Sequence, residues 1–270
     1  MSLSPLPYVG SKRTDIKFYE SKMPNPENID ISVELFGGSG YNSLYLFSKN
    51  DKIKSIINDN DEKLINFFNE TKKNPDAVIN GFNGLVEPRP SKEEFNKLKD
   101  EYQNNKSDNL RRAILYLFIN KFHGIRMLLY PTDKRNIGII KKDNYKTFFE
   151  WLKNTEFTLK DYSELYNEIK QDKSKKKYFI FLDPPYFDSF NKYYVMYQDK
   201  FTGEKTIKDN TGMYIEILKY LKENKKNTML IINKNCITEF IYKDYIKAEY
   251  DKTYQLTKKK TKHLIINNYK

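Results

Sequence analysis

The residues best suited to chemistry form one tetrapeptide, Asp183-Pro184-Pro185-Tyr186, which directly follows the apolar run 178–182. An exocyclic amine on a planar base has two N–H donors, which the Asp183 carboxylate and the Pro184 carbonyl can accept while Tyr186 stacks on the ring. The four residues are therefore candidate catalytic residues for chemistry on such an amine. The alternative is an ordinary turn, because Asp-Pro often begins one.

The element that must position this tetrapeptide is the run 178–182 itself, Tyr-Phe-Ile-Phe-Leu. Five apolar residues without alternation predict a strand buried on both faces, as in the middle of a parallel sheet. Each proline lacks an N–H, so the two prolines end the strand and form a rigid elbow. Open α/β sheets bind their ligands at the carboxyl ends of such strands.

A second candidate site lies nearer the N-terminus, where the apolar segment 31–36 runs into Gly37-Gly38-Ser39-Gly40 and then into a helical pattern through Phe47. Strand, glycine loop and helix together are typical of a site for a nucleotide-like ligand, because glycines let the backbone approach closely and the helix opens toward the ligand. The loop matches neither Gly-x-Gly-x-x-Gly nor a Walker loop, so a phosphate site is not favoured.

An acidic residue follows the next predicted strand, 53–57. Asp59 stands about twenty positions beyond the glycine loop, where dinucleotide-binding folds hold a pair of ribose hydroxyls. The alternative is the N-cap of the following helix, which Asn58, Asp59 or Asn60 could supply.

Two more charged residues are candidates for contacts with the same ligand. The segment 8–13 predicts a tight loop entering a helix, where backbone N–H groups favour an anion and Lys12 adds a positive charge, although such a turn is often only a turn. Asp161 follows a predicted strand at 157–159, and it either faces a bound adenine or caps the helix 163–169.

The stretch 71–154 differs from its surroundings and predicts a helical insertion that recognises a target. A capping-box pattern at Ser91 opens a polar helix, and an amphipathic helix follows at 109–122. Beyond it, 124–142 combines turn residues with basic side chains, as in a hairpin that contacts phosphates and base edges or in a basic surface loop. The candidate nucleic-acid contacts are Arg111, Arg126, Lys134, Arg135 and Asn136.

After the elbow the chain returns to a sheet-forming pattern. The expected elements are a helix at 213–221, a buried strand at 229–233 and an antiparallel pair at 254–256 and 264–266. His123 and His263 have no supporting pattern of metal ligands, so we predict ordinary hydrogen-bonded histidines and no metal site.

Composition narrows the class of protein. The 270 residues carry 48 basic and 36 acidic side chains, a net charge of +12, which suits a nucleic-acid partner but is also what an AT-rich genome would produce. Cys236 is the single cysteine, which favours a reducing compartment. The first residues lack the pattern of an export signal, and the longest apolar run, 113–119, is too short to span a membrane.

The order of these segments resembles the Dam-type, alpha-class N6-adenine DNA methyltransferases over essentially the whole chain. Cofactor motifs come first, a recognition insertion next, and the catalytic tetrapeptide after it. The matching residues are Tyr8-Val9-Gly10-Ser11-Lys12, Glu34 to Gly40, Asn58-Asp59 with Leu64, then Asn120, Phe122, Gly124 and Arg126, then Asp183 to Tyr186, and Leu264 to Asn268. The chain departs from the family pattern at Leu35 and Gly37, and at Lys262 or His263, where relatives often have Glu.

The resemblance implies a Rossmann-like methyltransferase α/β sheet, mostly parallel with a terminal antiparallel hairpin, formed by residues 1–70 and 155–270. It also implies that S-adenosylmethionine binds in the pocket from Phe36 to Gly40, with Asp59 on the ribose, and leaves as S-adenosylhomocysteine. The residues expected to contact this cofactor are Tyr8, Lys12, Glu34, Phe36, Gly38, Gly40, Asp59, Asp161 and Asp183.

The implied activity is methyl transfer to N6 of an adenine that has been flipped out of double-stranded DNA. Four alternatives stay open. Two are enzymes: an RNA adenine methyltransferase, and a DNA cytosine-N4 methyltransferase, which more often has Ser where Asp183 stands. The others are an inactive DNA-binding module on the same fold and a generic nucleotide-binding protein, which the missing phosphate-loop lysine disfavours. We expect a soluble monomer or weak dimer, with no membrane partner, that is associated with DNA inside a prokaryotic cell or, for a viral enzyme, inside its host.

Overall fold

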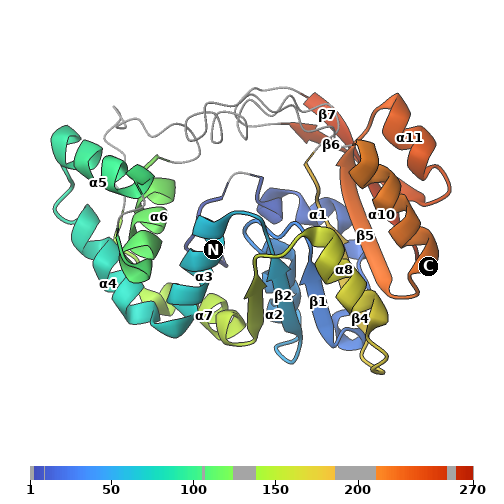
Figure 1. The fold of residues 1–270 in the computed structure, drawn as a ribbon, viewed down its shortest axis with the longest axis horizontal. Coiled ribbons are helices and arrows are strands. Elements are labelled where there is room, and N and C mark those ends of the chain that lie inside the picture. Colours follow the sequence, from blue (N-terminus) through green and yellow to red (C-terminus); the bar gives the residue numbers. More distant parts are fainter. Residues whose placement is uncertain are drawn as a thin grey trace. The chain divides into compact units, whose positions relative to one another are not determined.

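The structure, a computed structural model, describes residues 3–8, 10–104, 107–123, 138–185, 211–253 and 260–269. Within these ranges the strands form a seven-stranded sheet in the order β3-β2-β1-β4-β5-β7-β6 (Figure 1). Strand β2 runs parallel to both β1 and β3, and β4 runs parallel to β5, whereas β7 is antiparallel to both β5 and β6. The predicted class, a mostly parallel Rossmann-like α/β sheet with a terminal antiparallel hairpin, is confirmed.

The elements of the described chain, in order, are η1 (Lys12–Thr14), α1 (Ile16–Tyr19), η2 (Glu20–Lys22), η3 (Pro26–Asn28), β1 (Ile31–Glu34), α2 (Tyr41–Lys49), β2 (Lys54–Asn58), α3 (Glu62–Lys73), α4 (Pro75–Val86), α5 (Lys92–Asn104), α6 (Asn109–His123), η4 (Lys142–Tyr145), α7 (Lys146–Lys153), β3 (Thr155–Thr158), α8 (Tyr162–Gln171), β4 (Tyr178–Leu182), α10 (Thr211–Glu223), β5 (Asn227–Asn233), α11 (Cys236–Tyr242), β6 (Ile246–Thr253) and β7 (Lys260–Asn267).

These elements belong to two compact units. Unit 1 consists of Met1–Lys17 and Pro24–Tyr178, and unit 2 consists of Phe18–Met23 and Phe179–Lys270. The functional division predicted from the sequence, with a target-recognition insertion at 71–154, stays a prediction.

In unit 1 an aromatic cluster forms the centre of the core. Trp151 of α7 and Phe68 of α3 both pack on Phe157 of β3, with ring centroids 5.7 and 4.6 Å apart respectively. The Trp151 indole N–H donates to the hydroxyl of Ser55 on β2, which also pairs with the Ser32 hydroxyl at 3.1 Å. Burying these rings together supplies much of the apolar area that stabilises the unit.

The helices of unit 1 begin where side chains cap them. The capping box predicted at Ser91 is present, because the Ser91 hydroxyl accepts from Glu94 N at 3.2 Å and the Glu94 carboxylate accepts from Ser91 N at 2.7 Å. Helix α4 was not predicted; it starts at Pro75 after Asn74 caps it by accepting from Ala77 N at 3.0 Å. Figure 1 shows α4, α5 and α6 grouped together, and both α4 and α5 pack on α6.

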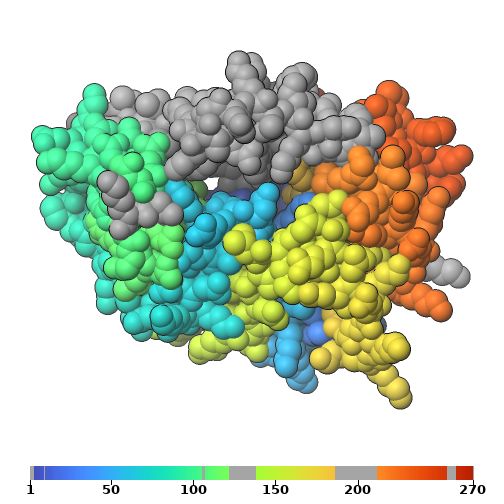
Figure 2. Space-filling model, viewed as in Figure 1, coloured from blue at the N-terminus to red at the C-terminus, as the bar shows by residue number. Residues whose placement is uncertain are grey.

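In unit 2 the strand β4 is buried at every position, as its unbroken apolar run predicted. It pairs in parallel with β5, which lies between β4 and β7. Helices α10 and α11 pack against each other and form one continuous surface, coloured orange to red in the space-filling view (Figure 2).

The predicted first strand of the terminal hairpin, 254–256, lies outside the described residues. The structure has a strand that the sequence did not predict directly before it, β6 (Ile246–Thr253), which pairs with β7 from Ile246↔Ile266 to Thr253↔Lys260. The second strand, predicted at 264–266, is confirmed within β7. His263 is fully buried on β7 and its ring Nδ1 lies 3.2 Å from the Tyr250 hydroxyl, so it is the hydrogen-bonded histidine that the sequence predicted.

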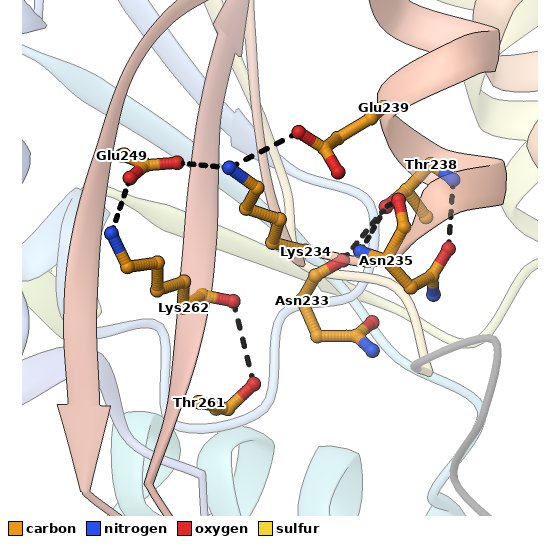
Figure 3. Close-up of polar contacts among 8 residues, drawn as sticks. All are labelled: Asn233, Lys234, Asn235, Thr238, Glu239, Glu249, Thr261 and Lys262. Carbon is orange, nitrogen blue, oxygen red and sulfur yellow. Dashed lines mark hydrogen bonds and ion pairs between the residues drawn. The ribbon is translucent and has the colours of Figure 1, made fainter.

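A cluster of ion pairs connects the hairpin to the end of β5 (Figure 3). The Glu249 carboxylate lies 2.6 Å from Lys234 Nζ and 2.5 Å from Lys262 Nζ, and Glu239 lies 3.1 Å from Lys234 Nζ. Hydrogen bonds from Lys234 and Lys262 lower the pKa of Glu249 to about 2. Lys262, one of the departures noted above, therefore pairs with an acidic residue of the same hairpin.

Replacing Glu249 by Gln is expected to remove a stabilising contribution that depends on pH. Because the pKa of the folded carboxyl is depressed from 4.5 to about 2, the contribution is fully present above about pH 4.5 and is lost as the pH falls toward 2. The urea midpoints of the wild type and Glu249→Gln should therefore differ at neutral pH and converge in acid. Salt at about 1 M should shrink the neutral-pH difference, since these charges are exposed. An equal difference at every pH would contradict the expectation.

Candidate active site

The glycine loop of unit 1 follows β1 and leads into α2. The loop is closed by two backbone hydrogen bonds, from Gly40 N to Gly37 O at 2.8 Å and from Gly37 N to Asn58 O at 2.7 Å. Gly38 and Gly40 have φ angles of 48° and 62°, a left-handed conformation that side chains with a Cβ disfavour. The predicted strand, glycine loop and helix are all present.

Close neighbours surround the loop on several sides. A Cβ at Gly37 would lie 2.4 Å from Ile57 Cγ2, and one at Gly38 would lie 2.8 Å from the ring of Tyr8. A Cβ at Gly40 would lie 2.7 Å from the ring of Trp151. Only glycine fits at these positions without movement, which gives a physical reason for Gly37, one of the departures noted in the sequence.

Glu34, at the end of β1, is buried and faces the start of α2. Its carboxylate accepts from Ser43 N at 2.7 Å and from the Asn42 side-chain amide at 3.2 Å. Helix α2 has no cap from its own N-cap residue, Gly40, so the strand supplies the acceptor that its first N–H groups need. Glu34 thereby holds the loop and helix in place; a direct contact with the cofactor stays a prediction.

Asp59 is joined directly to the glycine loop. Its carboxylate accepts from Gly38 N at 2.8 Å and from Asp61 N at 3.0 Å. The alternative that residues 58 to 60 supply the N-cap of α3 is wrong, because the cap is Asp61, which accepts from Lys63 N and Leu64 N at 2.9 and 3.2 Å. Burial raises the pKa of Asp61, and the charge of Asp59 also raises it.

Asn58 is a residue of this region that the sequence offered as a possible cap and as part of the family resemblance, but to which it assigned no role at the site. Its side-chain amide donates to Leu35 O at 3.2 Å and to Lys160 O at 3.0 Å, and its carbonyl accepts from Lys160 N at 2.9 Å and from the Thr158 hydroxyl at 2.8 Å. One buried side chain thus ties the ends of β1, β2 and β3 together. A buried amide at the end of an apolar strand was the available signal.

The N-terminal loop lies on the glycine loop, because the ring of Tyr8 is so close to Gly38 that an added Cβ there would lie 2.8 Å from it. Ser39 donates from its hydroxyl to that of Ser11 at 3.2 Å, which joins the two loops. Lys12 is buried at 5% exposure, and its Nζ lies 3.4 Å from Gly10 O. A buried lysine beside this loop is suited to an anionic group of a ligand.

Phe36 and Asp161 lie on the α8 side of the loop. The Phe36 ring packs on that of Tyr162, the first residue of α8, with centroids 5.0 Å apart. Asp161 is exposed and caps α8 by accepting from Ser163 N at 2.9 Å, so the capping role is present. Contacts of Phe36 and Asp161 with an adenine stay predictions.

The elbow of unit 2 begins where β4 ends at Leu182. Asp183 and Pro185 are half-buried and Pro184 is buried, while Tyr186 lies outside the described residues. The hydroxyl of Tyr214 on α10 donates to the Pro185 carbonyl. The predicted combination of a carboxylate and proline carbonyls at the carboxyl end of a fully buried strand is present.

Among the candidate DNA contacts, only Arg111 is described. Its guanidinium donates two hydrogen bonds to Glu101, both at 2.9 Å, and these bonds lower the pKa of the Glu101 carboxyl. Arg111 therefore joins α6 to α5, and its contact with DNA stays a prediction. The other candidates, Arg126, Lys134, Arg135 and Asn136, lie outside the described residues.

No cluster of three His, Cys, Asp or Glu side chains that could hold a metal ion occurs within the described residues. The helices in the same part of the chain are also too short or too polar to cross a membrane.

A strand, a glycine loop with left-handed glycines and an acidic residue bonded to that loop define an α/β protein that binds a nucleotide-like cofactor. Comparison with known proteins identifies the family to which the chain belongs. The family of D12 class N6 adenine-specific DNA methyltransferases matches residues 8–263. The chain belongs to this family, and S-adenosylmethionine is its methyl donor.

One similar relative is the Type II methyltransferase M.MjaIII of Methanocaldococcus jannaschii, which is 26% identical over 271 residues, covering 91% of this chain and 89% of the relative. A solved structure, the N-terminal domain of human METTL16 in complex with SAH, covers 94% of this chain and 67% of its own, at 10% identity and a TM-score of 0.36.

Replacing Gly40 by Ala is expected to destabilise the protein by roughly 2–4 kcal/mol, from left-handed strain and from overpacking against Trp151. Trp151 is the single tryptophan, so its fluorescence should change as well. Urea unfolding followed by tryptophan emission measures both effects.

Gly84→Ala is the matched control, since Gly84 lies exposed in α4 with no atom within 4 Å of an added Cβ. That variant should be neutral or more stable by up to about 1 kcal/mol. Equal stability of the Gly40 and Gly84 variants would contradict the packing described here.

Proposed function

We propose that this chain is an active, site-specific methyltransferase that modifies N6 of adenine in double-stranded DNA after flipping the base out of the helix. The observation that carries the proposal is the Asp183-Pro184-Pro185 elbow at the end of a strand buried along its whole length. Two acceptors on a rigid turn suit the two N–H donors of an exocyclic amine. Membership in the N6-adenine-specific family supports the same reaction.

In this proposal, the Asp183 carboxylate and the Pro184 carbonyl accept the two N–H groups of N6, and Tyr186 stacks on the base. The two acceptors draw the nitrogen lone pair out of conjugation with the ring and orient it for attack. When bound, S-adenosylmethionine would supply an electrophilic methyl group on its sulfonium. The N6–C bond would form as the C–S bond breaks, S-adenosylhomocysteine would leave, and N6 would lose one proton to water. Asp183 also stabilises the positive charge that develops on N6, so that orientation and electrostatic stabilisation together lower the barrier.

The cofactor is proposed to bind on the glycine loop of unit 1. Asp59 would accept from the ribose hydroxyls, and its bond to Gly38 N is what keeps the carboxylate beside the loop. Lys12 would pair with the carboxylate of the methionine part, while Tyr8 would line that end. The remaining proposed contacts are Phe36 and Asp161 at the adenine, the Gly38 and Gly40 backbone, and Asp183, with Glu34 holding the loop.

The proposed nucleic-acid surface is the insertion at 71–154. Its net basic character is part of the excess of 48 basic over 36 acidic residues, which favours binding to phosphates. Arg111, Arg126, Lys134, Arg135 and Asn136 are the proposed contacts. We further propose that the enzyme acts as a monomer or weak dimer inside the cell that holds its DNA.

Methylation of random-sequence duplex DNA, followed by mapping of the modified positions, tests the function. We expect N6-methyladenine at one short recognition sequence. Digestion of the product to nucleosides separates this result from N4-methylcytosine, and an RNA arm separates it from RNA methylation. No transfer to any substrate, together with no binding of S-adenosylmethionine in a calorimetric titration, would point to an inactive module instead.

A further inference from the structure

The elbow in unit 2 has a buried partner that the proposed reaction does not use. Tyr214, on α10, is 0% exposed, and its hydroxyl donates to the carbonyl of Pro185. A phenylalanine would fill nearly the same volume. The hydroxyl is therefore the feature that distinguishes this residue from an ordinary core aromatic.

The chemistry of proline makes this hydrogen bond important for geometry. Pro184 and Pro185 have no N–H, so neither residue can be tied to a neighbouring strand through a backbone donor. Their carbonyl oxygens are the backbone groups through which the elbow can be held. The Pro185 carbonyl belongs to the peptide unit that leads to Tyr186, and a planar peptide whose carbonyl is fixed has a fixed orientation.

Tyr214 is itself held by a second buried tyrosine. The hydroxyl of Tyr242, on α11, donates to the backbone carbonyl of Tyr214 at 2.9 Å, and Tyr242 is also 0% exposed. Burial is the main reason that the pKa of Tyr242 is raised, so this hydroxyl keeps its proton and remains a donor.

Helix α11 is in turn anchored to the end of β5 (Figure 3). Asn235 and Thr238 form a capping box, and the Thr238 hydroxyl also donates to Asn233 O at 3.0 Å. Thr238 and Tyr242 are four residues apart and so lie on one face of the helix. Hydrogen bonds therefore run from β5 through α11 and α10 to the elbow after β4, which pairs with β5.

We propose that Tyr214 is a positioning residue for methyl transfer and that Tyr242 acts through it; the inference rests on the function proposed above for the elbow. Tyr214 fixes the Pro185 carbonyl and thereby holds the backbone of the elbow, which carries the two acceptors. Without the Tyr214 hydroxyl, the Asp183 carboxylate and the Pro184 carbonyl are still present but are poorly oriented toward the amine. We expect the effect on the chemical step, since most of the proposed cofactor contacts lie outside the elbow.

The test compares Tyr214→Phe with Tyr220→Phe. Both residues are buried on α10, but the Tyr220 hydroxyl donates to the Glu216 carboxylate at 2.5 Å rather than to the elbow. Single-turnover methylation of random-sequence duplex DNA with tritium-labelled S-adenosylmethionine gives the rate, and calorimetry gives the dissociation constant of the cofactor. We expect the Tyr214→Phe rate to fall about 10- to 100-fold, with the cofactor dissociation constant and the Tyr220→Phe rate each within about twofold of the wild type.

Tyr242→Phe is a second test of the same role, and it replaces Tyr214→Phe if that variant does not fold. Alone, it should lower the single-turnover rate by a smaller factor, about 3- to 10-fold. In the double variant it should add almost nothing to the effect of Tyr214→Phe, because both act on the same carbonyl. If the rate reductions of the two single variants multiply in the double variant, Tyr242 does not act through Tyr214 and the proposed order of action is overturned.

Asp183→Ala measured beside these variants separates the two proposals. If the wild type methylates adenine, Asp183→Ala is inactive, and Tyr214→Phe matches Tyr220→Phe, the role of Tyr214 is overturned while the function stands. A Tyr214→Phe protein with a lower melting temperature but an unchanged rate per active site would likewise leave the tyrosine a purely structural role. If the wild type shows no adenine methylation, the function itself fails and the role of Tyr214 fails with it.

Discussion

Asp183→Ala is expected to abolish methyl transfer while cofactor binding remains measurable. The carboxylate is one of two proposed acceptors for N6, and the Pro184 carbonyl alone cannot orient the amine. Removing one preorganised hydrogen-bond donor of an oxyanion hole typically lowers a rate by about 10²–10³. We expect a comparable loss for a preorganised acceptor, and the lost orientation adds to this. We therefore expect a fall of at least about 1000-fold in single-turnover methylation of duplex DNA, with S-adenosylmethionine binding followed by calorimetry.

Two further variants help to interpret the methylation rate of Asp183→Ala. Asp183→Asn keeps the volume but replaces an ionised acceptor by an amide that also donates, so it should be almost as inactive as Asp183→Ala. Asp244→Ala is the matched control, because Asp244 is an exposed residue of the same unit, in the turn before β6, and should keep its activity. Near-native turnover in Asp183→Ala would remove the elbow from the proposed active site.

Asp59→Ala is expected to weaken cofactor binding by at least about 100-fold. The proposed ribose contact consists of two hydrogen bonds to an ionised group, each contributing about 1.5–3 kcal/mol, and each 1.4 kcal/mol is about tenfold in affinity. The substitution also frees Gly38 N, which now donates to Asp59 at 2.8 Å, and so loosens the glycine loop. Calorimetric titration with S-adenosylhomocysteine measures the affinity in the absence of turnover.

Asp59→Asn separates the two effects, because an amide oxygen can still accept from Gly38 N while the charge is lost. Its affinity should lie between those of the wild type and Asp59→Ala. Asp51→Ala, at an exposed turn before β2, is the control and should bind normally. An unchanged dissociation constant in Asp59→Ala would assign the ribose to another residue.

Local sequence patterns were enough to predict β1 and β4, the strands that lead into the glycine loop and the elbow. The unbroken apolar run of β4 and the segment that ends at the glycine loop each appeared as strands where expected. Such runs are informative because a strand buried on both faces needs apolar residues at every position. The capping box at Ser91 was equally local, since its two hydrogen bonds join residues three apart.

Strand β6 was not predicted because its own sequence signal is weak. Strand β6 lies at the edge of the sheet and has one neighbour, and along it only Tyr250 is buried. An edge strand with polar residues on most positions carries little apolar periodicity. Its position is decided by pairing with β7, the next described strand along the chain, and not by a pattern within β6 itself.

The sequence by itself determined the order of the parts: a glycine loop after one strand, an acidic residue after the next, and an elbow after a fully apolar strand. These features depend on the conformational freedom of glycine and proline and on burial, which are properties of single residues or short runs.

Only the tertiary structure decided what holds those parts in place. Asn58 binds Lys160, which is 102 positions away, and Tyr214 binds Pro185, which is 29 positions away. Hydrogen bonds between such distant residues leave no periodic trace in the sequence, because they depend on how the chain folds back on itself. The contacts that hold Glu34 and Asn58, and the contact behind the role proposed for Tyr214, could therefore be assigned only from the fold.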